Sequence, residues 1–308
     1  MSEKPDAVSG LQQPQTSVWR RARQAITDWE PVDLVIRLTL VMLLLYSGKQ
    51  WYEQLLMVGL SLCALVIPSL SREPKYWFLL FAVRAIVVNM YGWPYTDNHH
   101  YLMTYWCLAL GLALQSGQAR KVLAVNGRLM LGLAMLFAVI WKGTSWEYLD
   151  GTMFHFLLYE NSRFAELSRM FGDFDRVVGQ PGQSATQYML DLHPTIQLGD
   201  APQLVWMAQI VTWWTIFIES VVACLFLFTK TGSQSLWRHA ALQLFIVTTY
   251  PIATVITFAW VLIIFALAEC PLNMKRTRAT YVLLFLILTC FSRGALRETL
   301  FGLVQSLF

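Results

Sequence analysis

The sequence predicts an all-α protein, a polytopic transmembrane bundle of about eight helices (seven to nine) with an external cap segment. Apolar residues make up 56% of the chain and charged residues only 14%, against about 25% charged residues in soluble domains. The apolar residues fall in blocks near the roughly 20 residues that cross about 30 Å of hydrocarbon. Basic residues gather in alternate connections between these blocks, as the positive-inside rule requires.

Composition also excludes several classes of partner. The net charge of +4 is too small to indicate nucleic-acid binding. The five cysteines lie in or beside apolar segments without paired spacing, so they form neither a disulfide framework nor a metal motif. The expected partner is the lipid bilayer, with no nucleic acid and no metal.

The chain divides into three parts. Residues 1–30 hold a polar tail and, at 18–29, a basic amphipathic helix lying on the cytoplasmic membrane surface. Residues 31–292 form the transmembrane domain. Residues 293–308 form an amphipathic tail, because leucines recur there at helical spacing.

Seven apolar segments predict one membrane span each. They are residues 32–47, 54–70, 76–93, 98–115, 122–142, 204–228 and 279–291. The stretch 239–269 has 31 residues and holds Tyr250-Pro251 near its centre, so it is either one long kinked helix or a broken pair. The basic residues at 275–278 belong in the cytoplasm, which favours the pair.

Loop charges set the topology. Basic residues occupy alternate connections, which places these connections and the N-terminus in the cytoplasm: Arg20, Arg21, Arg23, Arg72, Lys75, Arg120, Lys121, Lys230 and Arg238. Residues 143–203 then face outward. This segment is too long for an ordinary connection. We interpret it as an external cap, with an interfacial helix at 153–159 and a flexible break at 179–184. The alternative is a plain surface loop.

Lys142 ends the long apolar helix 122–142. A lysine there has its stem in hydrocarbon, and its pKa can fall far enough for it to act as a base. The alternative is that Lys142 extends to the headgroups without a chemical role.

Two ionisable residues lie deeper in predicted spans. Arg84 and Glu219 both fall near mid-membrane, where a charge usually faces the bundle interior with a partner. We expect them to pair, either to fix helix packing or to bind an anionic or quinone-like ligand. Arg37 and Arg128 lie near cytoplasmic helix ends, where extension to the headgroups explains them.

His99 and His100 open the span that precedes the Lys142 helix, at the same outer level. Consecutive helices are normally neighbours, so these histidines and Lys142 are expected to share one outward-facing polar pocket. The alternative is a hydrogen-bonded histidine pair at the interface. Zinc is not predicted, because no third or fourth ligand has suitable spacing and His155, His193 and His239 are scattered.

Several motifs together resemble a known family. They are Asn98-His99-His100-Tyr101-Leu102, the helix ending at Lys142 with Trp146 and Gly151 after it, Glu219, and Gln243-Leu244-Phe245 with Tyr250-Pro251. In this order they resemble the membrane domain of vitamin K-dependent gamma-glutamyl carboxylase, and more closely its bacterial relatives, the horizontally transferred transmembrane (HTTM) family. The resemblance covers about residues 30 to 290.

The resemblance implies a membrane enzyme that uses a reduced naphthoquinone, of vitamin K or menaquinol type, with O2 and CO2. A lysine at the position of Lys142 would deprotonate the quinol, oxygen would convert it to a strongly basic alkoxide, and that base would remove a proton from a glutamate side chain to which CO2 adds. His99 would support this chemistry. Contacts to substrate or cofactor are expected from Asn98, His100, Tyr101, Arg84, Trp146 and Glu219.

The expected location is a bacterial inner membrane, with the active site outward and a secreted peptide or protein as a possible substrate. The chain departs from the carboxylase in having Trp141 where the carboxylase has a second lysine, and in lacking the large external domain that holds the protein substrate. The competing class is non-enzymatic: a small-molecule transporter, or a maturation or immunity subunit for a secreted peptide. The sequence shows no inverted internal repeat, which counts against transport.

Overall fold

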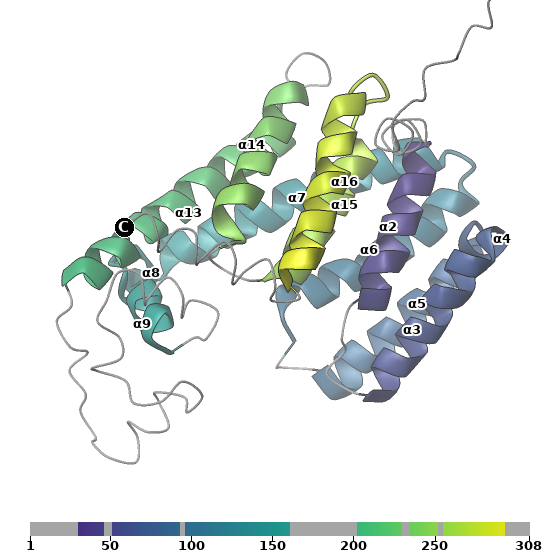
Figure 1. Cartoon of the computed structure of the whole chain (residues 1–308), viewed down its shortest axis with the longest axis horizontal. Helices are drawn as coiled ribbons and strands as arrows, with labels where there is room; N and C mark the ends of the chain where they lie inside the picture. Colours follow the sequence, from purple (N-terminus) through teal and green to yellow (C-terminus); the bar gives the residue numbers. More distant parts are fainter. Residues whose placement is uncertain are drawn as a thin grey trace, which may run out of the picture.

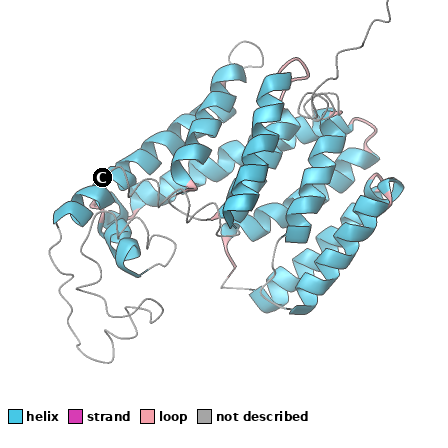
Figure 2. Cartoon of the chain, in the orientation of Figure 1, coloured by secondary structure: helices cyan, strands magenta, loops and turns pink. Residues whose placement is uncertain are grey.

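The computed structural model describes residues 30–45, 51–92, 96–160, 202–229, 235–251 and 255–292. Within these ranges every regular element is a helix and none is a strand (Figure 2). The amphipathic helix expected at 18–29, the break at 179–184 and the tail 293–308 lie outside the described residues, as does most of the external cap.

Each predicted span contains a helix. The long helices are α2 (Pro31–Leu45), α3 (Trp51–Val66), α5 (Pro74–Val87), α6 (Asn98–Gln115), α7 (Ala119–Thr144), α13 (Pro202–Phe228), α14 (Ser235–Thr249), α15 (Ile256–Glu269) and α16 (Lys275–Ser292). A π-helical turn, Val88–Gly92, extends α5, and the short helices are α4 (Pro68–Ser71), α8 (Trp146–Leu149) and α9 (Thr152–Glu160). The stretch 239–269 belongs to two helices, which confirms the predicted pair. Pro251 lies in the connection between them, as expected of a residue that cannot continue a helix.

Helix α15 is the centre of the bundle. All its residues from Ala259 to Glu269 are buried, and it packs against α7, α2, α16 and α6. A helix that is apolar on every side belongs in such a position. Gly127 of α7 allows the closest approach, because a Cβ there would lie 2.5 Å from the backbone oxygen of Phe265.

Helices α7 and α13 are the longest and pack against each other along their lengths (Figure 1). In the described part of the chain they contain the two stretches that are long and apolar enough to cross a membrane, Ala119–Thr144 and Val205–Phe228. The ends of α4, α6, α13 and α15 lie toward the same end of the bundle, the upper end in Figure 1. The basic residues that flank these ends are therefore on one side of the molecule.

Candidate functional site

Lys142 lies in the last turn of α7, and its amine turns toward α13. The Nζ atom lies 2.5 Å from both carboxylate oxygens of Glu219. Only 12% of the lysine side chain and 9% of the glutamate side chain are exposed. Glu219 lies within the apolar stretch of α13, so the amine sits inside the apolar part of the bundle. Lys142 is therefore held by Glu219 and is mostly buried, and its chemical role stays a prediction.

The ring of Tyr148 lies over the Lys142 amine. This tyrosine lies on α8, just beyond the end of α7, and the Lys142 amine is 5.3 Å from the centre of its ring. Its hydroxyl is 3.2 Å from the Thr215 hydroxyl, which itself donates to the Thr212 carbonyl. Tyr148 must therefore be the donor. Burial raises the pKa of the Tyr148 hydroxyl, which keeps the proton for this bond.

Two hydroxyls, one on α13 and one beside the end of α14, are buried without a hydrogen-bond partner among the described residues. They belong to Thr212, one turn before Thr215, and to Tyr250 at the end of α14. The Tyr250 hydroxyl lies within electrostatic range of the Glu219 charge. A buried polar group without a partner requires a water, an ion or a ligand.

Arg84 has a different partner from the expected one. It is fully buried on α5, and its Nη1 lies 3.8 Å from the carboxylate of Glu53 in the first turn of α3. The predicted pairing of Arg84 with Glu219 is wrong, because depth along the sequence does not tell which helices face each other. Glu53 is itself a buried helix residue.

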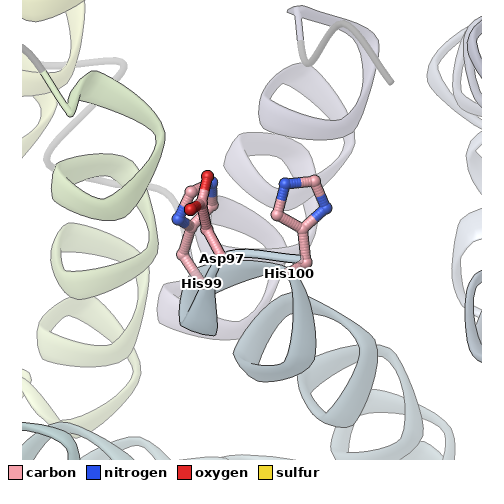
Figure 3. Close-up of side chains that lie close together, drawn as sticks. All are labelled: Asp97, His99 and His100. Carbon is pink, nitrogen blue, oxygen red and sulfur yellow. The ribbon is translucent and has the colours of Figure 1, made fainter. Parts of the chain in front are cut away.

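His99 and His100 begin α6 together with Asp97 (Figure 3). Each of the three residues offers one ligand atom, and these atoms lie within 4.8 Å of one another. Asp97 adds a third potential ligand atom that sequence spacing had not supplied, and the signal that could have found it is its position just before the histidines. Lys142 lies with α13 and α8 instead, so a pocket shared with the histidines stays a prediction.

Three further residues were expected to contact substrate or cofactor: Asn98, Tyr101 and Trp146. Asn98 is exposed at the start of α6 and Tyr101 is half-buried one turn later. Trp146 is 75% exposed on α8, and the aromatic side chain over the lysine is Tyr148 instead.

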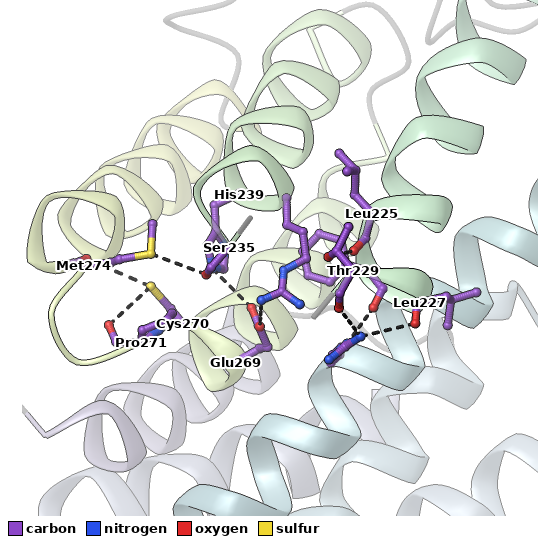
Figure 4. A network of polar contacts seen from close by, with 12 residues as sticks. Leu225, Leu227, Thr229, Ser235, His239, Glu269, Cys270, Pro271 and Met274 are labelled. Carbon is purple, nitrogen blue, oxygen red and sulfur yellow. Dashed lines mark hydrogen bonds and ion pairs between the residues drawn. The ribbon is translucent and has the colours of Figure 1, made fainter. Parts of the chain in front are cut away.

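A second polar cluster was not predicted (Figure 4). Arg238 of α14 lies 2.6 Å from the carboxylate of Glu269 at the end of α15, and His239 Nε2 lies 3.2 Å from the same carboxylate. The other ring nitrogen of His239 is 3.1 Å from the Tyr281 hydroxyl on α16. We name Arg238, His239, Glu269 and Tyr281 the arginine network.

Arg128 adjoins this network from α7. It donates to the carbonyls of Phe226, Leu227 and Thr229, which end helix α13. A cation at a helix C-terminus stabilises the free carbonyls there. The interpretation that Arg128 extends to the headgroups is therefore wrong.

Comparison of the chain with models of protein families, with curated proteins and with solved structures finds no match.

Proposed function

We propose that the chain is a polytopic membrane protein of the bacterial inner membrane, with its N-terminus in the cytoplasm. Two helices have the length and composition of spans, and the basic residues flank helix ends at one end of the bundle (Figure 1). Large apolar side chains are also exposed along the longest helices, more than a soluble surface normally carries: Phe137, Ile140, Trp141, Trp206, Ile210, Trp213 and Phe217.

We further propose that it is an enzyme of the carboxylase/epoxidase-like class, in which Lys142 takes a proton from a reduced quinone at the outward part of the bundle. The observation that carries this proposal is the Lys142–Glu219 pair. Both carboxylate oxygens of Glu219 lie within hydrogen-bonding distance of the Lys142 amine, so a proton can pass between the two groups. Glu219 thus provides a place for the proton that an ammonium must lose before it can act as a base.

In this proposal the buried hydroxyls of Thr212 and Tyr250, which have no hydrogen-bond partner among the described residues, offer hydrogen bonds to the quinol oxygens. The ring of Tyr148 lies over the amine. When bound, a reduced quinone would supply an acidic hydroxyl and, with O2, a stronger base than any side chain. O2, CO2 and a secreted peptide substrate enter this proposal through the family resemblance alone.

One observation favours the non-enzymatic alternative, a transporter or a maturation or immunity subunit. Buried acid–base pairs also occur at Arg84–Glu53 and Arg238–Glu269, where the base is an arginine, which stays charged in proteins. Such pairs fix helix packing without any exchange of protons. The Lys142–Glu219 pair could serve the same purpose.

The variant that separates the two functions is Lys142→Arg. An arginine keeps the charge and can pair with Glu219, but it cannot act as a base. The measurement is oxygen-dependent epoxide formation by purified protein in detergent, with reduced menaquinone or vitamin K. Lys121→Arg, on the exposed first turn of the same helix, is the matched control.

We expect epoxide from the wild type and from Lys121→Arg, and a loss of at least about 100-fold in Lys142→Arg with an unchanged unfolding temperature. A primary amine added to Lys142→Ala should restore part of the rate, which a purely structural lysine would not allow. Absence of epoxide from folded wild-type protein across a panel of quinols, or full activity of Lys142→Arg, would refute the catalytic lysine.

A further inference from the structure

The geometry points to a binding site for one divalent transition-metal ion, formed by Asp97, His99 and His100 at the start of α6. This site shares no residue with the Lys142–Glu219 pair, and the inference does not depend on the proposed enzyme. Two imidazoles and one carboxylate are a ligand set that suits Zn²⁺ and its neighbours among the transition metals.

The three ligands converge in an unusual way for their spacing. Successive residues of a helix normally point about 100° apart, yet the rings of His99 and His100 have centroids only 4.7 Å apart, with an angle of 39° between their planes. One ligand atom from each of the three residues lies within 4.8 Å of the others. In a tetrahedral zinc site neighbouring ligand atoms are about 3.3 Å apart, so small side-chain rotations close the remaining gap.

Asp97 provides a second, independent observation. It occupies the N-cap position of α6, where an aspartate side chain ordinarily accepts a hydrogen bond from the first turn. Its side chain makes no such capping bond and lies beside the two histidines (Figure 3). The carboxylate is therefore in place for a ligand other than its own helix.

Burial completes the description of the site. Both histidines are buried, at 8% and 6% exposure, while Asp97 is exposed. An ion would thus enter from the Asp97 side and be held against the bundle by the rings. Three protein ligands leave at least one coordination position for water or another molecule, as in zinc sites that are not purely structural.

The test is metal binding by the full chain in detergent, without a histidine tag and after treatment with a chelator. Zn²⁺ alone is titrated by calorimetry, and Co²⁺ alone is followed by its visible absorption, which reports the ligand geometry. The variants are Asp97→Asn, His99→Ala and His100→Ala. His155→Ala on α9 is the matched control, because it removes a histidine outside the cluster.

We expect one equivalent of Zn²⁺ per chain in the wild type and in His155→Ala, and affinity weakened more than about tenfold in each ligand variant. Asp97→Asn keeps the test valid if a histidine variant does not fold, because Asp97 is exposed. Absence of saturable binding in the wild type, or unchanged affinity in Asp97→Asn, would overturn the site.

Discussion

The Lys142–Glu219 pair and the arginine network are both buried groups of opposite charge, but they differ in the base. At Lys142 the amine has one carboxylate partner and an aromatic ring. In the network Arg238 is fully buried against a carboxylate that also contacts a histidine. A lysine can give up its proton, whereas an arginine cannot. The Lys142–Glu219 pair is therefore suited to proton transfer, and the arginine network is suited to holding helices together.

The position of each group supports this division. The network joins the start of α14 and the end of α15 to α16, and Arg128 adds the end of α13 (Figure 4). These helix ends are separate in sequence, so their polar contacts hold the bundle together at the end where the basic connections lie. The Lys142–Glu219 pair joins only α7 and α13, which already pack along their lengths. Its loss should therefore leave more of the fold intact.

The largest expected effect is that of Glu269→Leu. Removing this carboxylate leaves Arg238 buried without its counter-charge, which should lower the free energy of unfolding by about 3–5 kcal/mol. Glu219→Leu should cost less, about 1–3 kcal/mol, because the Lys142 side chain keeps 12% exposure whereas that of Arg238 has none. Tryptophan fluorescence during denaturation in micelles measures both, with Glu73→Leu at an exposed position as the control. Equal losses for the two variants would remove the distinction between the groups.

Features that depend on neighbouring residues in the chain were predicted from the sequence, whereas contacts between different helices were not. Helix α6 has the predicted bounds, 98–115, and the break at Pro251 is present, because apolar block length and proline geometry are local properties. The partners of Glu219 and Glu269 were not predicted. Each lies on another helix, and a sequence gives the depth of a residue but not the direction in which its helix face points.

Arg128→Ala should have the next largest effect on stability. The guanidinium donates to three carbonyls at the end of α13, and its removal leaves them with fewer donors at a place of negative helix dipole. We expect a loss of about 2 kcal/mol in the free energy of unfolding. Arg120→Ala, at an exposed position two turns earlier on the same helix, is the control and should change it by less than about 0.5 kcal/mol. Similar values for both would assign Arg128 to the surface.

The smallest effect is expected from Tyr281→Phe, which tests whether the network extends to α16. The change removes the hydroxyl that lies 3.1 Å from His239 Nδ1 and keeps the buried ring. We expect a loss of about 1 kcal/mol in the free energy of unfolding, because this hydroxyl contacts both the ring and the backbone carbonyl of His239. Tyr105→Phe removes an exposed hydrogen bond to Asn126 and should have no measurable effect. If the two variants are alike, His239 is oriented by Glu269 alone, and α16 is held by its apolar packing against α15.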